Sequence, residues 1–487
     1  MKIPRVMSTQ HPDNVIVPFF AESPEMSGDD EVQEAYYIFS HLGCDEQMWD
    51  SEGKEVDDFV VRKLLTRYPD FFKQKVLGRE VFLTLRIPNP EIEKGEAKVV
   101  LETLESIPRS RDAAVLFYGE EVAPIFEVIL PMTTSARELD RIYDFYRNFI
   151  YERQYQPILP GDMTLAEWIG EFKPQAIQLI PLFEDMEHML EAHRIVEEYL
   201  QGKDLSYMRV FLARSDPALN YGVISAVLFN KIALQRLRKL SQRTGVKVYP
   251  ILGAGSPPFR GNLTPYTVNE VLAEYPEVET FTVQSAFKYD YPVEDVIQAI
   301  KLLKSAARRP FQEIDEERWI AQGRRLAQEY QRQAELLAPL VNAIARFVPR
   351  RRMRKLHVGL FGYSRNFGKA KLPRAIGFCA ALYSIGLPPE FLGLSALTHE
   401  AWRDLSEVYV NLEKDMASAA RFFNPDCLEI LPEEVRSDIK TEFLVSYQPN
   451  EAHRAITSRI IRHLKAGISE GIQEMIVEAG HVRGFLG

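Results

Sequence analysis

The sequence predicts an α/β protein, a (β/α)8 TIM-like barrel with extensive additional α-helices. Two observations lead to this prediction: short apolar, β-branched runs recur along the chain, and helical stretches lie between them. Most runs are continuous rather than alternating, which is typical of strands buried on both faces of a parallel sheet. Strands that alternate with helices indicate βα units, and about eight such units close a barrel.

The predicted strands are located by their apolar runs. They span residues 5–9, 82–86, 125–131, 177–183, 209–215, 246–252, 280–286 and 357–363. Between them, stretches such as 186–200 and 221–245 place apolar residues at helical spacing. We therefore expect one catalytic barrel domain over 1–487. A helical insertion is expected at 293–355, before the last strand, and a helical C-terminal extension at 375–487.

A basic stretch, PRRRMRK, ends the predicted insertion at residues 349–355. Such a run is usually a solvated face or a subunit contact, and the alternative is a patch that binds phosphate or nucleic acid. The net charge of −10 argues against nucleic acid as a partner of the whole chain.

Cysteine usage and hydropathy indicate the compartment. Cys44, Cys379 and Cys427 lie far apart and form no CxxC pair, so neither a disulfide framework nor a zinc site is expected. The N-terminus lacks the apolar region of a signal peptide, and no apolar run approaches the ~18 residues of a membrane span. We expect a cytoplasmic protein with no membrane partner.

Polar residues follow the predicted strands, where the catalytic residues of a barrel lie. In chain order the candidate site residues are His11, Arg86, Glu184, Arg214, Asp216, Arg260, Gln284, Lys288, Arg365 and Arg374. Each has a structural alternative: His11 could belong to a frayed tail, the acids could cap helices, and the arginines could form surface ion pairs. The convergence of these residue types at the strand ends favours a site.

The residue types predict the chemistry of that site. Glu184 and Asp216 follow neighbouring predicted strands, and carboxylate ligands suit Mg²⁺ or Mn²⁺. Arginines bind phosphate and carboxylate groups in a bidentate manner. The glycine-rich segment GAGSPPFRGN, residues 253–262, can direct backbone N–H groups at an anion. Together they predict a site for a small, phosphorylated, multiply anionic substrate on a divalent metal ion.

Six motifs carry a resemblance to a known family. They are STQHPDN (8–14), PLFED (181–185), FLARSDPALNYG (211–222), GAGSPPFRGN (253–262), TVQSAFKYDYP (282–292) and GYSRNFGKAKLPR (362–374). They resemble phosphoenolpyruvate carboxylases of the short, archaeal type, over essentially the whole chain. The long bacterial and plant enzymes look like more distant relatives, and they carry two arginines in the glycine-rich loop where this chain has one.

The resemblance implies roles for the candidate residues. The implied catalytic residues are His11, Arg260 and Arg365, and the implied metal ligands are Glu184 and Asp216. The residues expected to bind substrate are Arg86, Arg214, Gln284, Lys288 and Arg374. The implied cofactor is Mg²⁺ (or Mn²⁺), and the implied assembly is a homotetramer.

The implied reaction is the irreversible carboxylation of phosphoenolpyruvate by bicarbonate, which yields oxaloacetate and phosphate and supplies C4 dicarboxylic acid. It passes through carboxyphosphate and a metal-stabilised pyruvate enolate, and His11 removes the proton of carboxyphosphate. One alternative is a metal-dependent aldolase-type lyase acting on a substrate that forms a pyruvate enolate. Another alternative is a non-enzymatic, metal-stabilised binding or regulatory protein on a barrel that has lost its activity. Such a protein would lack His11, Glu184 or Asp216, and this sequence contains all three.

Overall fold

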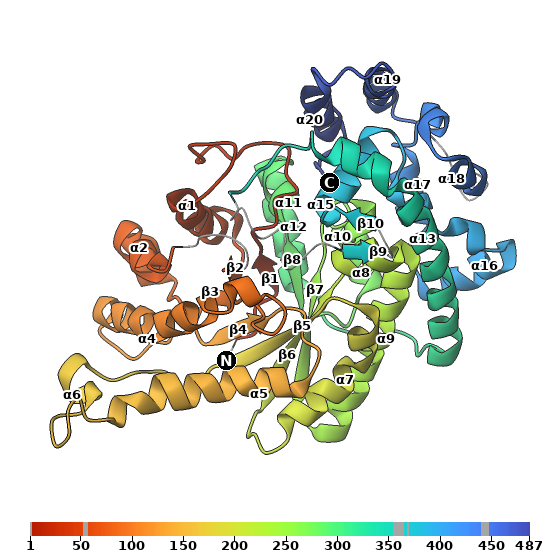
Figure 1. Cartoon of the computed structure of the whole chain (residues 1–487). Coiled ribbons are helices and arrows are strands. Elements are labelled where there is room, and N and C mark those ends of the chain that lie inside the picture. Colours follow the sequence, from red (N-terminus) through yellow and green to blue (C-terminus); the bar gives the residue numbers. More distant parts are fainter. Residues whose placement is uncertain (1, 52–56, 354–364, 368–369, 440–447) are drawn as a thin grey trace.

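Eight parallel strands form a closed barrel in chain order, and β8 pairs with β1 (Figure 1). The computed structural model describes residues 2–51, 57–353, 365–367, 370–439 and 448–487. The barrel strands are β1 Val6–Ser8, β2 Glu46–Asp50, β3 Phe82–Arg86, β4 Glu127–Leu130, β5 Gln178–Phe183, β6 Tyr207–Ala213, β7 Lys247–Gly253 and β8 Thr280–Val283. The predicted fold class is confirmed.

The identity of one strand was predicted wrongly. All predicted runs except the last contribute a barrel strand, but the barrel closes without 357–363, which lies outside the described residues. The missing strand is β2, whose sequence EQMWD is not a continuous apolar run. Because β8 ends at Val283, residues 293–355 follow the last barrel strand instead of interrupting the barrel.

A buried ionic layer explains why the sequence of β2 lacks an apolar pattern. Arg209 on β6 donates to Glu46 on β2, 2.7 Å away, and to Glu127 on β4, 2.9 Å away, and all three side chains are buried. Alternate residues of a strand face the same side, so Glu46 and Met48 both point into the barrel. A buried apolar cluster that includes Met48 and Phe211 forms a second group of barrel residues.

Helices cover the barrel and extend beyond it. The helices up to the last barrel strand are α1 Asp29–Tyr37, α2 Val60–Arg67, α3 Pro69–Gln74, α4 Val99–Tyr118, α5 Ala136–Phe145, α6 Leu165–Ile169, α7 Met186–Leu200, α8 Ser215–Tyr221, α9 Val223–Thr244 and α10 Val268–Glu274. Those after it are α11 Ser285–Tyr289, α12 Val293–Ser305, α13 Glu316–Ala345, α15 Ala375–Ser384, α16 His399–Val408, α17 Leu412–Ala420, α18 Glu433–Asp438, α19 Glu451–Lys465 and α20 Ile472–Arg483.

Short elements connect these helices. The 3-10 turns are η2 Lys94–Glu96, η4 Glu152–Tyr155, η5 Pro258–Arg260, η6 Pro389–Phe391, η7 Leu394–Ala396 and η8 Pro425–Ile430. Two π-helical segments, η1 Ile38–Leu42 and η3 Tyr146–Tyr151, extend α1 and α5. A separate two-stranded antiparallel sheet pairs β9 Arg365–Phe367 with β10 Ala370–Leu372.

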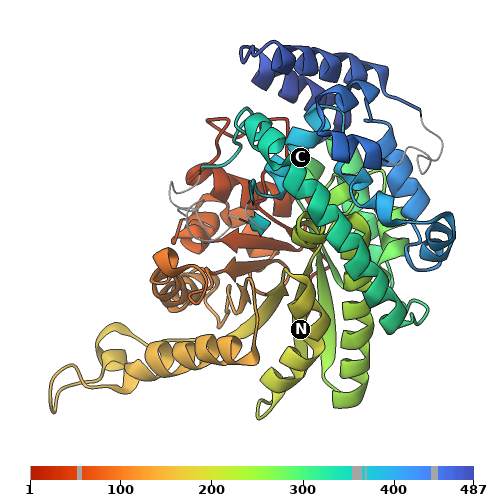
Figure 2. The same ribbon diagram turned by 45° about the vertical axis from the view of Figure 1, so that its right-hand side comes forward.

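The C-terminal helices reach the end of the barrel where the strands terminate. The backbone N–H of Leu486 donates to the carbonyl oxygen of Asp13, which follows β1, at 2.7 Å. Figures 1 and 2 show α16 to α20 grouped on this side of the molecule, while α5 and α6 form an arm that projects away from the barrel. The extension therefore contributes to the end of the barrel that is expected to carry the site.

Among the described residues, no single helix is long and apolar enough to cross a membrane. A bent pair, Ala375–Ser384 with Pro389–Ala396, reaches that length and composition. Most of its residues are buried in the structure.

Candidate active site

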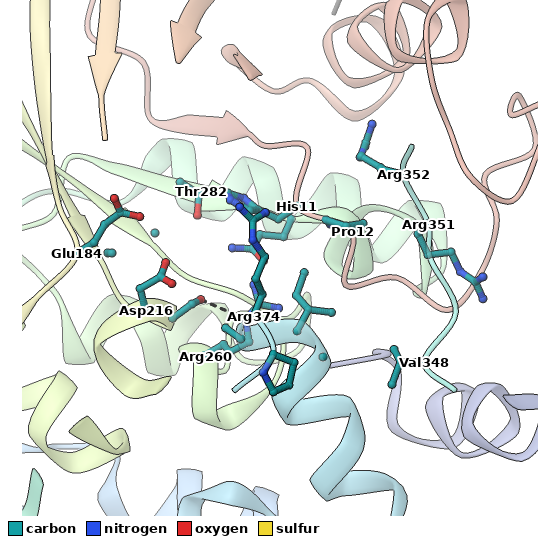
Figure 3. A pocket seen from close by; sticks show the side chains of 18 of the residues that line it. His11, Pro12, Glu184, Asp216, Arg260, Thr282, Val348, Arg351, Arg352 and Arg374 are labelled. Atoms are coloured by element: carbon teal, nitrogen blue, oxygen red, sulfur yellow. Dashed lines mark hydrogen bonds between the residues drawn. The ribbon is translucent and has the colours of Figure 1, made fainter. Parts of the chain in front are cut away.

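A cavity of about 610 Å³ opens at the carboxyl ends of the barrel strands. The predicted residues that line it are His11, Arg86, Glu184, Asp216, Arg260, Gln284 and Arg374. Side chains of the apolar cluster, including Met48, Leu182 and Phe211, line the same cavity. Figure 3 shows Glu184 and Asp216 on one side, His11, Arg260 and Arg374 in the centre, and Arg351 and Arg352 on the other side.

The two acids lie at the ends of adjacent strands. Glu184 directly follows β5, and Asp216 lies in the first turn of α8, just after β6. The backbone N–H of Met132 donates to Glu184 Oε2 at 2.7 Å, and Arg86 Nη2 lies 3.8 Å from Glu184 Oε1. One oxygen of the Glu184 carboxylate is thus held by a backbone hydrogen bond, and the other lies within ion-pair distance of a guanidinium.

This pair of carboxylates fits a hard divalent cation. Within the described part of the chain, no group of three or more His, Cys, Asp or Glu side chains could hold a metal ion. Two carboxylates suit Mg²⁺, which keeps several waters and takes substrate oxygens as further ligands. The donor set disfavours zinc, whose sites usually present three or four nitrogen and sulfur ligands.

His11 stands on a short, firmly held segment after β1. Its Nδ1 atom lies 2.8 Å from Thr9 Oγ1, and its carbonyl oxygen accepts from the N–H of Ser285 at 3.2 Å and of Asp13 at 3.1 Å. The contact with Thr9 orients the imidazole ring. The segment is therefore not a frayed tail, and the ring is exposed to the cavity.

Arg260 is buried in a network of protein acceptors. Its guanidinium donates to Ser215 Oγ (3.2 Å), Asp13 Oδ2 (3.2 Å), the carbonyl oxygen of Gly487 (2.7 Å) and Gln284 Oε1 (2.5 Å). These four bonds leave one of its five N–H groups for a ligand. Arg260 is consequently held in one orientation at the cavity wall.

Glycine at position 255 permits this arrangement. A Cβ atom there would lie 3.1 Å from Arg260 Cζ and 3.1 Å from Gln284 Oε1. The absence of a side chain therefore lets the loop backbone approach the guanidinium closely.

Two of the predicted substrate ligands are directed elsewhere, which corrects the prediction. The Arg214 guanidinium is buried and donates to Tyr275 Oη at 3.3 Å and to the Phe259 carbonyl at 3.1 Å. Lys288 is also buried, and its Nζ donates to Ser8 Oγ, the Thr9 carbonyl and Glu34 Oε1 at 2.8–3.0 Å. Neither residue is among those that line the cavity.

The environment of Lys288 is an ionic cluster beneath the segment that carries His11. Arg352 donates to both oxygens of Glu34, at 2.6 and 2.7 Å. Burial by itself would raise the pKa of Glu34, but Arg352 and Lys288 hold it well below its usual range. Burial lowers the pKa of Lys288. The cluster anchors the end of β1 through Ser8 and Thr9.

The remaining predicted arginines lie on the segment before α15. Arg374 occupies the residue before α15 and lines the cavity. Arg365 begins β9, but its side chain lies outside the described residues. Lys371, between them, also lines the cavity.

The structure also gives a place at the site to residues outside the predicted catalytic, substrate-binding and metal-binding set. Asp13 is one of the polar residues that follow the first predicted strand, although no role was predicted for it, and its carboxylate binds Arg260. Arg350, Arg351 and Arg352 all line the cavity, and Arg351 and Arg352 are buried. Their interpretation as a solvated face or subunit contact is therefore wrong for those two. The position of Asp13 follows from its closeness to His11 in the chain, whereas the proximity of 350–352 to the site arises from the fold and leaves no local signal in the sequence.

Comparison with known proteins identifies the family of this chain. A family model described as phosphoenolpyruvate carboxylase matches residues 3–487. This chain belongs to that family. Curated relatives named phosphoenolpyruvate carboxylase include a protein of Methanospirillum hungatei JF-1, 55% identical over 487 residues and 100% of both chains. That of Methanothermobacter thermautotrophicus is 54% identical over 489 residues, again 100% of both. That of Halobacterium salinarum is 50% identical over 491 residues, 100% of this chain and 99% of the relative.

These phosphoenolpyruvate carboxylases are archaeal, so the resemblance drawn from the six motifs is confirmed. Among solved structures, an HpcH/HpaI aldolase from Desulfitobacterium hafniense DCB-2 aligns with 63% of this chain and 95% of its own. Its identity of 14% and TM-score of 0.32 are too low to carry an argument about function.

Proposed function

We propose that this chain is a phosphoenolpyruvate carboxylase, which joins bicarbonate and phosphoenolpyruvate to give oxaloacetate and phosphate. The observation that carries the proposal is the meeting of His11, Glu184, Asp216 and Arg260 in one cavity of a chain matched by the family over residues 3–487. The family match favours this activity over the aldolase-type lyase considered from the sequence.

Glu184 and Asp216 would hold Mg²⁺ or Mn²⁺. Support comes from their position at the ends of adjacent strands and from their all-oxygen donor set. When bound, the ion supplies Lewis-acid polarisation of the substrate oxygens.

Cationic side chains would bind the anionic substrates around this position. Arg86 and Arg374 line the cavity on elements distant in sequence, and Gln284 and Arg260 are hydrogen-bonded to each other at its wall. Arginine N–H groups stabilise the charge that spreads over a transferring phosphoryl group. The motif GYSRNFGKAKLPR assigns Arg365 to the same set, whereas Arg214 and Lys288 bind protein acceptors away from the cavity.

His11 would act after the phosphoryl group has moved to bicarbonate. We assign to its imidazole the removal of the proton from carboxyphosphate, which then divides into CO2 and phosphate beside the enolate carbon. Imidazole suits this step because its ordinary pKa of about 6.5 lies near neutrality. Thr9 fixes the ring orientation through Nδ1.

The test separates phosphate transfer from carboxylation. Purified wild type and His11→Asn are supplied with phosphoenolpyruvate, bicarbonate and Mg²⁺, and pyruvate and oxaloacetate are measured by separate coupled assays. We expect wild type to form oxaloacetate and the variant to form mainly pyruvate. His463→Asn, a half-buried residue of α19 that does not line the cavity, serves as the control. Failure of wild type to form oxaloacetate overturns the proposed activity, and a wild-type product ratio in His11→Asn overturns the role of His11.

We further propose a homotetramer in the cytoplasm. The arm of residues 136–169, which runs from α5 to α6, projects from the barrel (Figure 2). It supports an interface, because it exposes the large apolar side chains of Phe149, Tyr155, Leu159, Trp168 and Ile169. Clustered exposed apolar residues mark protein contacts. Light scattering on wild type and Leu159→Asp tests this: we expect a tetramer and a smaller species, respectively. A wild-type mass near the 56.0 kDa of one chain would contradict the proposal.

A further inference from the structure

The glycine-rich loop that carries Arg260 contains two consecutive residues with positive φ. These are Gly261, with φ 126°, and Asn262, with φ 54°. A Cβ atom at Gly261 would lie 2.9 Å from the Cβ of Ala254, so a larger residue does not fit there. Positive φ is uncommon in residues with a side chain, and asparagine is among the types that tolerate it best. The conformation at Asn262 therefore depends on compensating contacts.

Within the loop, the backbone N–H of Asn262 donates to the Pro257 carbonyl at 2.9 Å and its carbonyl accepts from Thr267 Oγ1. The C-terminal extension supplies the contact to the side chain. The Nδ2 atom of Asn262 donates to Asp415 Oδ1 on α17 at 2.7 Å. The other oxygen, Oδ2, accepts from Tyr409 Oη at 2.6 Å. All three side chains are buried, so loss of either hydrogen bond would leave a polar group with neither a protein partner nor water to bind.

The segment that carries Asp415 is itself attached to the barrel. The N–H of Asn411 donates to Glu274 Oε2 at 2.6 Å, and Asn411 Nδ2 donates to the Glu270 carbonyl at 2.6 Å. Both acceptors lie on α10, and α17 also packs against η5, which contains Arg260. Asp415 is thus a fixed point against which the loop is held.

We propose that Asp415 is a positioning residue for Arg260: its carboxyl group holds Asn262 in the left-handed conformation and so fixes the loop that directs Arg260 at the cavity. Asp415 lies 155 positions after Arg260 in the chain and is not among the residues that line the cavity. The inference rests on the role proposed above for Arg260.

The test uses five variants, one of them a double variant, whose kcat, KM for phosphoenolpyruvate and melting temperature are measured together. Asp415→Ala and Asn262→Ala each remove the hydrogen bond, and we expect kcat to fall between about tenfold and 100-fold, as for a displaced catalytic group. In Asn262→Gly the glycine adopts positive φ without a side-chain contact, so we expect this variant to keep most of the wild-type kcat. For the same reason, we expect the double variant Asn262→Gly with Asp415→Ala to regain much of the kcat that Asp415→Ala loses. Asp426→Asn is the matched control, because its contact with Ser458 in the same extension does not reach the loop.

The outcomes separate positioning from simple stabilisation. Rescue of kcat by Asn262→Gly in the Asp415→Ala background supports the proposal, since loss of packing alone would not be rescued. Wild-type kcat in Asp415→Ala or Asn262→Ala, at a temperature where both are folded, overturns it. Arg260→Gln is measured in parallel: if that variant keeps wild-type activity, the proposed role of Arg260 fails, whatever the Asp415 variants do.

Discussion

Arg260 Nη1 lies 3.2 Å from Asp13 Oδ2, and both side chains are buried. The other carboxylate oxygen, Asp13 Oδ1, accepts from the backbone N–H of Ala286 at 2.7 Å. Burial raises the pKa of Asp13, and Arg260 acts in the opposite direction. One carboxylate therefore joins the segment after β1, the glycine-rich loop after β7 and the start of α11. His11, two residues before Asp13, belongs to the same junction.

The first prediction concerns Asp13→Asn. The amide can still accept from Ala286, but its NH2 group then faces the guanidinium of Arg260, so a donor meets a donor. We expect kcat/KM for phosphoenolpyruvate to fall about tenfold to 100-fold and stability to fall by about 1–3 kcal/mol. Steady-state kinetics and denaturant unfolding check both values.

Glu279→Gln is the control for Asp13→Asn. Glu279 precedes β8 at the opposite end of the barrel, where it binds Arg5 at 2.9 Å. It should leave kcat/KM unchanged. Equal kinetics in the Asp13 and Glu279 variants would show that the Asp13–Arg260 pair has no bearing on activity.

The second prediction concerns the metal ion. Glu184→Gln removes one of the two carboxylates. Loss of a residue that only hydrogen-bonds a metal ligand costs at least about tenfold in affinity, so we expect the Mn²⁺ affinity of Glu184→Gln to fall by more than that. Electron paramagnetic resonance of free Mn²⁺ measures this without turnover. Glu187→Gln, exposed on α7 and paired with Arg324, should bind Mn²⁺ as wild type does. Unchanged affinity in Glu184→Gln would remove Glu184 from the metal site.

The third prediction concerns the ionic layer inside the barrel. Arg209→Met leaves Glu46 and Glu127 buried without a cation, so we expect a loss of about 3–5 kcal/mol of unfolding free energy. A triple variant that also replaces Glu46 by Met and Glu127 by Leu should recover most of this loss, because no unpaired charge remains. Chemical unfolding monitored by circular dichroism measures both. A triple variant less stable than the single one would contradict this account.

The fourth prediction concerns the pH dependence of stability. Burial raises the pKa of Glu390 to about 7. The folded protein then binds more protons than the unfolded chain, whose glutamates titrate near about 4.3, so this group lowers stability as pH rises through that window. Glu390→Gln cannot ionise and can still accept from Tyr383. We expect the melting temperature of Glu390→Gln minus that of wild type to be larger at pH 8 than at pH 5.

Glu433→Gln provides the comparison for Glu390→Gln. Its carboxylate is exposed at the start of α18, so its melting temperature relative to wild type should not change with pH in the same way. A pH-independent difference between Glu390→Gln and wild type would show that Glu390 ionises normally in the folded protein.

The sequence by itself determined the barrel class and most strands, because strands buried on both faces require continuous apolar runs such as 177–183. It did not reveal β2, because Glu46 faces inward and is neutralised by Arg209, a partner 163 residues away. The same reasoning predicted the residues at strand ends, since barrel topology brings those ends together; His11, Glu184 and Asp216 all line one cavity.

Tertiary structure decided where each cation is directed. Arg214 and Arg260 both follow barrel strands, yet Arg214 is directed at Phe259 and Tyr275, while Arg260 lies at the cavity wall. Residue type and position along a strand restrict a side chain to one end of the barrel. Which acceptor it meets there depends on loops and on the C-terminal helices, whose contacts span hundreds of residues and leave no periodic signal in the sequence.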